Sequence, residues 1–574
     1  MIFNGVRVEY GVIDSTIAKD TIAISESSNS PYSMPEKLTD EQVDERKKIA
    51  YLEKDYFLLD GSFVLAEEDT EYDVGWESSA LSSASGLINE YIEFAFGEYH
   101  GSYGIQIRFP DNAIANDFTI DYYEDEDLIG TLDVTGNTAA AYTNSDVRLN
   151  WNKVRITFTG VNPQQRARVW YVSFGVNEVY TEDYLTSVSA TKSTDFTGDY
   201  DKSGEFSFQF YNDGRFDAMQ INGLPIGLQE GLKVAIYFRK QGETTYTLFG
   251  NYFSEETVIE ENGRIVSVSG YDELYRMNDS TYRKGIVYDN GRSLYDWAVE
   301  VAEDAGVEII VDEAFKNIIS YGYINTVPHR EALRLIAEAV NGMLYIVGRD
   351  IMLKKHVPVD KGAITADDIV DGSHSLESSD RVLGINVYKY DFSATAEPME
   401  LGKIENISLT ATEQTIDIQY STYPVKTDTV QVTVTGAQVV SKQIYAESCS
   451  ITISGTIGGV ATITVTGNTY NVATTSVTRG SKAKNIKTLE SNYLITGNIA
   501  DDVADYQYER VVNKYRHSLE IVNDIDYDLG DRVEITTDSV AVQSDVAPQT
   551  QFITTVSVEM DDSDMTIELE AIDE

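Results

Sequence analysis

Cysteine is almost absent from this sequence, with Cys449 the only one among 574 residues. One thiol cannot form a disulfide within the chain, and the sequence has neither a CxxC motif nor a Cys/His cluster, which excludes a structural zinc site. Cys449 lies in the strand-like run ESCSITISG, where we expect a buried, inert thiol. The composition is typical of a protein that matures in a reducing compartment and is held together by packing or oligomerisation.

Long apolar runs are also missing. No segment approaches the roughly 18 consecutive apolar residues that a membrane-spanning helix needs. The first residues, MIFNGVRVEYGV, alternate apolar and polar side chains and show no basic segment followed by an apolar block. This pattern predicts a strand and not a signal peptide.

Basic residues are few. Asp and Glu number 94 against 44 Lys and Arg, which gives a net charge of −50. Such a chain repels DNA phosphates, which argues against a role in gripping DNA. Two interpretations remain open: an acidic surface that keeps a β-rich protein soluble, or the lining of a conduit through which DNA slides without sticking.

Catalytic and metal-binding motifs are missing as well. The sequence contains no GxSxG, HExxH, P-loop or GxGxxG motif. Its five histidines lie in different predicted units: His100, His329, His356, His374 and His517. We expect His329 to contact the start of a helix and not to act in catalysis. The sequence therefore predicts a protein that is not an enzyme and that has no cofactor.

Two acidic runs are candidates for calcium, which needs several convergent oxygen ligands. They are DYYEDEDLIG, with Asp121, Glu124, Asp125, Glu126 and Asp127, and DFTGDYDKSGEF, with Asp195, Asp199 and Asp201. Neither matches the EF-hand spacing, and solvated loops are the preferred interpretation. Glycoside hydrolysis needs a pair of carboxylates. The sequence has so many acidic residues that such a pair could be chosen in many places, so it does not indicate this activity.

The pattern that is present predicts a mainly β, multidomain chain with a small α+β part. Short runs of alternating residues with turn signals between them are typical of sandwiches and small barrels. We predict these units: N-terminal strands and a helical linker (1–60), a β-sandwich (61–180), an antiparallel barrel (181–283), an α+β unit (284–360), a second β unit (361–402 with 485–574) and a small immunoglobulin-like sandwich (403–484).

Two segments carry helical periodicity in the α+β unit. In SLYDWAVEVAEDAG, apolar residues recur at helical spacing, with Ser293 as the expected cap and Gly306 as the stop. In HREALRLIAEAVNG, Leu333, Ile336 and Val340 share one face, and Gly342 is the expected end. A third helical stretch is expected over 36–55, where Thr39 and Gln42 suit a capping box.

The 61–180 sandwich is rich in aromatic residues. Trp76, Trp151 and Trp170 lie there together with many tyrosines. Two interpretations are open: exposed rings that stack on sugars, or aromatic side chains of the core. The same unit begins beside Asp60-Gly61, where a charged run changes to a Ser- and Gly-rich passage.

The order of these pieces is more informative than any one of them. GRIVSVSGYDELYRMNDSTY is followed by the SLYDWAVEVAEDAGVEI helix and then by HREALRLIAEAVNGMLYIVGRDIMLKK. Near the end, NYLITGNIADDVADYQYERVVNKYRHSLEIVNDIDYDLGDRVEI leads into the final strands. This succession, over residues 181–402 and 485–574, resembles the baseplate hub, or tail-tip, protein of long-tailed bacteriophages.

The 61–180 unit carries a resemblance of its own. Its runs LDGSFVL, VGWESSALS, IQIRFP, WNKVRITF and ARVWYVSFG resemble the galactose-binding-like jelly roll inserted in some phage tail proteins. The resemblance implies that Asp60-Gly61 is the seam of an insertion and that residues 1–20 add strands to the 181–283 barrel.

The hub resemblance implies a homotrimer in which two barrel-like domains per chain alternate in a ring at the virion tail tip or baseplate. The implied partners are a tail tube or distal tail protein, other baseplate or receptor-binding proteins and possible host surface glycans, with DNA passing through without specific binding. Assembly would take place in the host cytoplasm, and any wall-digesting activity is expected to lie elsewhere. The alternative is a carbohydrate-binding adhesin that acts through the 61–180 jelly roll.

Overall fold

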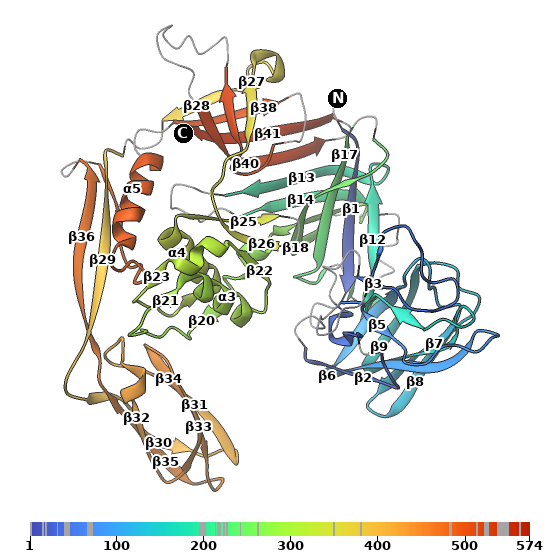
Figure 1. Cartoon of the computed structure of the whole chain (residues 1–574), viewed down its shortest axis with the longest axis horizontal. Coiled ribbons are helices and arrows are strands. Elements are labelled where there is room, and N and C mark those ends of the chain that lie inside the picture. Colours follow the sequence, from blue (N-terminus) through green and yellow to red (C-terminus); the bar gives the residue numbers. More distant parts are fainter. Residues whose placement is uncertain are drawn as a thin grey trace.

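The computed structural model describes residues 3–573 except 14–16, 18–19, 31, 40–45, 66–72, 195–202, 213, 215–219, 222–223, 226–227, 241–242, 261–262, 348–349, 379–381, 482–484, 512–514, 522–526, 537–549 and 562–563. The chain is mainly β and multidomain, as the sequence predicts. A long central sheet carries an N-terminal unit (residues 17–174) and a helical unit, and an arm (residues 395–469) projects from the strand pair of β29 (Gly384–Ala394) and β36 (Tyr470–Gly480) beside the helical unit (Figure 1).

The central sheet has 13 strands among the described residues. Its alternating pattern is clear in β14, where Phe206, Phe208 and Phe210 are buried and the residues between them are not. The strands follow one another across the sheet in this order: β12 (Gly175–Thr181), β1 (Phe3–Ile13), β17 (Lys233–Lys240), β18 (Thr247–Ile259), β19 (Ile265–Tyr271), β14 (Glu205–Tyr211), β13 (Leu185–Ser193), β40 (Thr550–Asp561), β41 (Asp564–Asp573), β38 (Tyr515–Ile521) and β28 (Ser375–Ser378), with β39 (Arg532–Ile535) beside β40 and β27 (Asp360–Ile364) beside β39.

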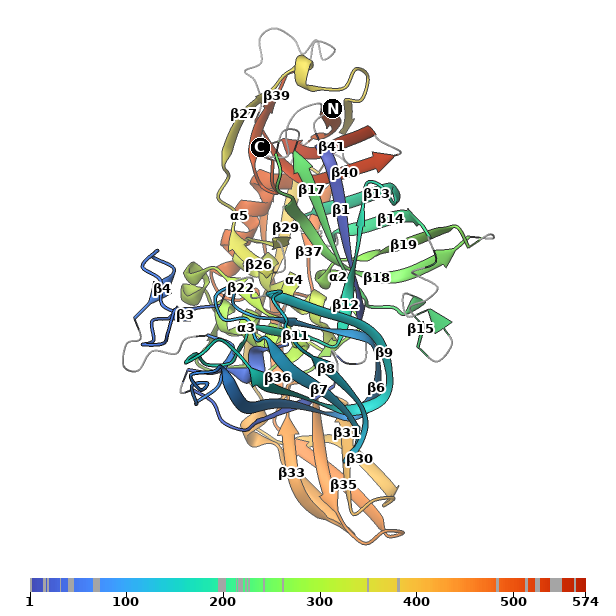
Figure 2. The same ribbon diagram turned by 90° about the vertical axis from the view of Figure 1, so that its right-hand side faces the viewer.

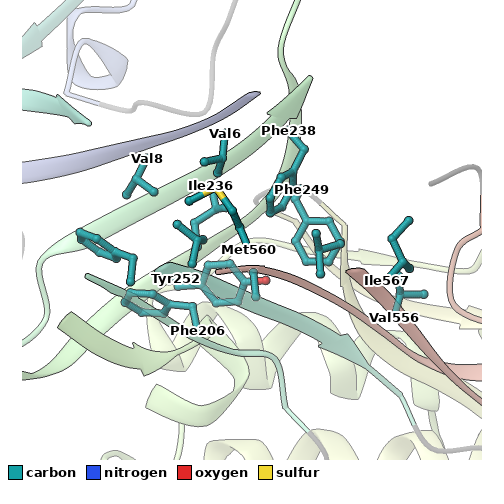
Figure 3. Packing of buried hydrophobic residues seen from close by; sticks show 14 of the residues in the cluster. Val6, Val8, Phe206, Ile236, Phe238, Phe249, Tyr252, Val556, Met560 and Ile567 are labelled. Atoms are coloured by element: carbon teal, nitrogen blue, oxygen red, sulfur yellow. The ribbon is translucent and has the colours of Figure 1, made fainter. Parts of the chain in front are cut away.

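One strand pair joins the two halves of this sheet. β13 runs antiparallel to β40, with Val188 opposite Met560. Side chains from both halves form one buried cluster, and Figure 3 shows Val6 and Ile236 near Met560. The barrels predicted for 181–283 and for the C-terminal segment therefore share a sheet and a core. A short hairpin, β15 (Gln220–Ile221) with β16 (Leu224–Pro225), lies outside the central sheet.

The N-terminal unit is inserted between two adjacent strands of the central sheet. β1 and β12 are antiparallel, and Ile13 at the end of β1 lies opposite Gly175 at the start of β12. The strands of the unit are β2 (Ile22–Glu26), β3 (Lys48–Ile49), β4 (Phe63–Val64), β5 (Trp76–Glu77), β6 (Leu87–Arg108), β7 (Asp117–Glu124), β8 (Asp127–Val134), β9 (Ala141–Gly160), β10 (Arg168–Val169) and β11 (Tyr171–Ser173). Its main sheet has the order β11-β6-β9-β7-β8, and β2 also pairs with β6.

This arrangement corrects the predicted seam at Asp60-Gly61 and the boundary at residue 61. β2 pairs with β6, and Ile17 and Leu38 belong to the core of the unit, so the unit begins soon after β1. Asp60 instead accepts a hydrogen bond from the backbone N–H of Ser62, at 2.9 Å, in an exposed turn. The seam was misplaced because the pairing of β2 with β6 spans about 70 residues and leaves no local signal.

The predicted helix over 36–55 is also wrong where the structure describes it. The single 3₁₀ turn η2 (Pro35–Lys37) and the two-residue strand β3 occupy parts of this stretch. Gln42 of the expected capping box lies outside the described residues. Lys48 and Ile49 pair with Phe63 and Val64, so a strand contact replaces the helix.

The helical unit has a separate core. Ser293 caps α3 (Leu294–Ala305) by accepting from the N–H of Asp296 at 3.0 Å, and Gly306 ends it with φ 72°. Asn341 (φ 54°), not Gly342, ends α4 (His329–Val340). The other elements are α2 (Glu273–Arg276), β20 (Thr281–Tyr282), β21 (Arg292–Ser293), β22 (Ile309–Val311), η4 (Glu313–Asn317), β23 (Ile319–Ser320), β24 (Val327–Pro328), β25 (Gly342–Val347) and β26 (Asp350–Lys355).

The predicted unit of 361–402 with 485–574 is divided between two cores. β27 and β28 belong to the central sheet, with η5 (Ala366–Asp368) between them. β29 (Gly384–Ala394), β36 (Tyr470–Gly480) and β37 (Ile486–Leu489) form a separate sheet. That sheet and α5 (Ile499–Val511) contribute Ile385, Leu489 and Val503 to the core of the helical unit. These strands were assigned to the wrong unit because an alternation of apolar residues does not show in which core the apolar side chains are buried.

The arm is inserted in the same way as the N-terminal unit. β29 and β36 are antiparallel, and their last pair is Ala394 with Tyr470. The predicted range 403–484 therefore begins inside a strand of the arm and ends beyond β36. The arm contains β30 (Met399–Ser408), β31 (Glu413–Gln419), η6 (Thr427–Thr429), β32 (Gln431–Thr435), β33 (Gln438–Ile444), β34 (Ser448–Ser454) and β35 (Val460–Gly467). Both views show it extending away from the central sheet (Figures 1 and 2).

We predict that residues 14–174 can be replaced by an Asn-Gly turn without loss of the remaining fold. Ile13 and Gly175 already lie opposite each other, and Asn-Gly suits a two-residue hairpin. Circular dichroism and size exclusion should show a soluble protein with a cooperative thermal transition. Deletion of 62–178 is the control, because it removes part of β12 and leaves β2 without β6, and it should aggregate. A soluble control beside an insoluble 14–174 variant would contradict this boundary.

Candidate functional site

The aromatic residues of the N-terminal unit are mostly core residues. Trp76 and Trp151 are 0% exposed. Trp76 stacks on Phe158 with ring centroids 5.2 Å apart, and Trp151 contacts Phe96 and Phe174. Their predicted contact with carbohydrate is wrong for this arrangement, because neither ring offers a face to solvent. Alternating aromatic residues in strands are a signal of a sandwich core as much as of a sugar platform.

Trp170 is placed differently and is half-buried. Its backbone N–H donates to the carbonyl of Arg108 at 2.8 Å, and its carbonyl accepts from Nε of Arg46. Nζ of Lys48 lies 5.4 Å from the centre of its ring, which is within the range of a cation–π contact. Sugar contact by Trp170 stays a prediction.

A buried ionic cluster lies next to these residues. The guanidinium of Arg168 contacts Glu53 through two nitrogen atoms, at 2.7 and 2.8 Å, and Glu77 through Nε at 2.9 Å. All three side chains are at most 2% exposed. Burial lowers the pKa of Arg168, but the hydrogen bonds to Glu53 and the charge of Glu77 outweigh it and leave that pKa raised. The cluster fixes the segment around Glu53 against β10.

Ser280, His329 and Asp304 lie together although they are distant in sequence. Nδ1 of His329 is 2.8 Å from the hydroxyl of Ser280, and Nε2 is 3.1 Å from a carboxylate oxygen of Asp304. Lys284 also pairs with Asp304, at 2.6 Å. The backbone N–H of His329 donates to the carbonyl of Ser280. This N–H group is therefore not free to stabilise a negatively charged oxygen atom of a substrate. The group ties the loop after α2 to α3 and α4.

The sequence indicated His329 at a helix start, and the structure places it as the first residue of α4. It did not indicate Ser280 or Asp304, since the contact depends on how α3 packs against α4. Among the other histidines, His100 contacts Asp20 at 3.0 Å and His356 contacts the carbonyl of Gly530 at 2.9 Å.

His374 and His517 form a pair at the last strand of the central sheet. Nε2 of His374 is 3.2 Å from Nδ1 of His517, and the rings are stacked with centroids 5.4 Å apart. Burial, and then the charge of His517, lower the pKa of His374. The pair lies where β28 joins β38.

No group of three or more potential ligands suited to a metal ion lies in the described part of the chain. In the first acidic run, Asp125 accepts from the hydroxyl of Tyr99 at 2.9 Å and from Asn152 at 3.0 Å. Asp195, Asp199 and Asp201 of the second run lie outside the described residues. Cys449 is buried, as predicted, and burial raises the pKa of its thiol, which is typical of an inert cysteine.

None of the helices in the described ranges has the length and apolar character that a membrane crossing requires. No known family model and no curated protein matches the sequence.

Solved structures similar to this chain do exist. The 43 kDa tail protein of prophage MuSo2 from Shewanella oneidensis has 13% identity and a TM-score of 0.39 over 69% of this chain and 95% of its own. A tail protein from Neisseria meningitidis has 11% identity and a TM-score of 0.39 over 69% and 94%. The prophage tail protein gp18 from Listeria monocytogenes has 9% identity and a TM-score of 0.37 over 69% and 90%. All three are tail proteins.

We predict that Arg168→Met lowers the free energy of unfolding of the N-terminal unit by about 3–5 kcal/mol, because the buried Glu77 loses its cation and the buried Glu53 keeps only Arg166, at 3.1 Å. Urea unfolding followed by tryptophan fluorescence measures this unit, which holds three of the four tryptophans. Arg155→Met is the matched control: its partner is Glu93 at 2.6 Å, but the arginine side chain is 35% exposed. That control should cost about 0–1 kcal/mol. Equal losses would contradict the role of Arg168.

We predict that acid weakens the attachment of β28. The lowered pKa of His374 means that the unfolded state binds the proton more readily. The stabilisation is therefore complete above the ordinary histidine pKa of about 6.5 and is lost as the pH falls through the lowered pKa. Protection of residues 375–378 against hydrogen exchange, corrected for the intrinsic slowing of exchange in acid, should therefore fall as the pH is lowered from 7.5 to 5.

The variant His374→Gln should remove this loss of protection, because glutamine cannot take up the proton. Residues 205–211 of β14, in the same sheet, are the internal control and should show no extra change. An unaltered pH response in the variant would exclude His374 as its source.

Proposed function

We propose that this protein is a structural, non-enzymatic component of a phage tail that forms a trimeric hub at the tail tip or baseplate. The hub joins the tail tube or a distal tail protein to other baseplate or receptor-binding proteins. It surrounds a channel through which DNA passes without specific binding. The protein assembles in the host cytoplasm and ends in the virion tail.

The observation that carries the proposal is the pairing of β13 with β40. It holds the strands of residues 185–271 and those of residues 515–573 in one sheet over one core. Each chain thus contributes two β units in a fixed relation, and three chains would contribute six. This fits the order of segments along the sequence that resembles baseplate hubs.

The charge supports a channel. Each chain carries −50, so a ring of three concentrates negative charge around the passage and repels the DNA backbone. The same charge opposes association of the chains at low ionic strength, and salt screens that repulsion. Oligomerisation would also supply stability that the chain cannot gain from disulfides.

We predict that light scattering in moderate salt gives a mass near three times 64.0 kDa, with a smaller fraction of trimer at low salt. The variant with residues 14–174 replaced by Asn-Gly should also give three times its own mass, because the central sheet makes the contacts. A monomer at both salt concentrations and at high protein concentration would contradict the hub. A full-length trimer with a monomeric variant would instead place the contacts in the N-terminal unit.

A further inference from the structure

His374 and His517 bring two ring nitrogen atoms face to face at the end of the central sheet. The chain has only five histidines, and these two are 143 residues apart in sequence. Nε2 of His374 nevertheless lies 3.2 Å from Nδ1 of His517. Both side chains are half-buried, so water and ions can reach them. The pair therefore places two potential metal ligands side by side at an accessible point.

The separation of the two nitrogen atoms suits a single metal ion. Zn²⁺ binds imidazole nitrogen at about 2.0–2.1 Å with tetrahedral angles, which places two such nitrogen atoms about 3.3 Å apart. The observed 3.2 Å is close to this value. The ring planes are inclined by only 23°, so both rings must turn about their Cβ–Cγ bonds to direct their lone pairs at one ion. That torsion has broad minima in histidine, so the turn costs little.

Metal binding also requires one change of hydrogen position. In the neutral pair, one of the two facing nitrogen atoms carries a hydrogen atom, whereas a metal ion needs the lone pair of both. The hydrogen atom therefore moves to the other nitrogen of its own ring, which is Nδ1 of His374 or Nε2 of His517. No net proton is released, because each ring stays neutral.

The backbone around the pair is fixed before any ion binds. β28 runs antiparallel to β38, with Leu376 opposite His517. Just before β28, the hydroxyl of Ser373 accepts from the N–H of Glu520 at 3.0 Å and donates to the carbonyl of Val370 at 2.8 Å. Figure 1 shows β28 and β38 together at the end of the sheet. Ligands that are already held in place lose little conformational entropy on binding.

The donor atoms select the class of metal. Imidazole nitrogen suits Zn²⁺, Cu²⁺ and Ni²⁺, whereas Ca²⁺ and Mg²⁺ prefer oxygen ligands. We propose that His374 and His517 together bind one divalent transition-metal ion of this first class, with water at its remaining positions, and that the ion clamps β28 to the central sheet. The inference does not depend on the hub proposal, because it concerns two strands of one chain.

The clamp would act where the sheet is held by few bonds. β28 has four residues and is the last strand in the order of the central sheet. Its attachment to β38 extends over four residue pairs. An ion that binds both histidines binds only the attached state, so it lowers the population of the detached state.

The test uses the full-length protein, first freed of metal with EDTA, which is also the state to which the pH dependence of β28 applies. Zn²⁺ is titrated at pH 7.5, above the ordinary histidine pKa of about 6.5, in competition with a fluorescent zinc indicator. Millimolar Mg²⁺ occupies carboxylates that would otherwise bind Zn²⁺ weakly.

Three variants are compared with the native protein, and circular dichroism verifies their folding. His374→Gln and His517→Gln each remove one ligand. Leu376→Gln is the matched control: it changes an exposed side chain, directly opposite His517 in the same strand pair, and removes no ligand. We expect each histidine variant to bind Zn²⁺ at least tenfold more weakly than the native protein and the control to bind it unchanged.

Equal affinity in the native protein and the histidine variants, or no binding at millimolar Zn²⁺, would overturn the proposal. Loss in only one histidine variant would overturn coordination by the pair. An equal loss in Leu376→Gln would assign the effect to disturbance of the strands and also overturn it.

Hydrogen exchange tests the clamp itself. Saturating Zn²⁺ should slow exchange of residues 375–378 at least tenfold in the native protein and in neither histidine variant, while residues 205–211 of β14 stay unchanged. Binding through both histidines without this protection would overturn the clamp. A rise in light-scattering mass on addition of Zn²⁺ that needs both histidines would assign the ion to a contact between chains and overturn it as well.

Discussion

Two backbone pairs, Ile13 with Gly175 and Ala394 with Tyr470, set the organisation of this protein. Each is the last pair of an antiparallel ladder, and in each case a complete β unit leaves the ladder at that point and returns to it. The two strands of each ladder pair up to this point as they would if a tight turn joined them. Long insertions add little to the entropy of closing a loop, so the β1–β12 and β29–β36 ladders tolerate these units.

The arm is nevertheless held in one orientation. Glu447 accepts from the hydroxyl of Tyr323 at 3.1 Å and from the N–H of Thr326 at 3.0 Å. Asp289 accepts from Nζ of Lys426 and from the hydroxyl of Tyr470, at 2.6 and 2.8 Å. Tyr323, Tyr470 and Ala446 form a small buried cluster at this junction. Because these contacts link the arm to the helical unit, its direction follows that unit.

The clearest local signals were predictable from the sequence, whereas the helix over 36–55 was not, and neither were the long-range contacts. The cap Ser293 and the stop Gly306 of α3 depend on residues within one turn, so the sequence places both. The seam at Asp60-Gly61 was wrong because the true boundary depends on β2 reaching β6. Trp76 and Trp151 could not be assigned to core or surface, since alternation along a strand does not say which face is covered. Ser280 and Asp304 escaped notice because only the packing of α3 on α4 brings them to His329.

Insertion at a single strand pair also explains which surfaces of the protein can change without disturbing the fold. A β unit that leaves a ladder at one pair can change its surface without disturbing the register of the central sheet, whose core joins β13 to β40. The N-terminal unit shows the same division between a fixed interior and an exposed surface. Arg168 binds Glu53 and Glu77 in the interior, while Leu59 faces solvent. Substitutions on the outer side of residues 50–62 therefore leave the anchorage intact.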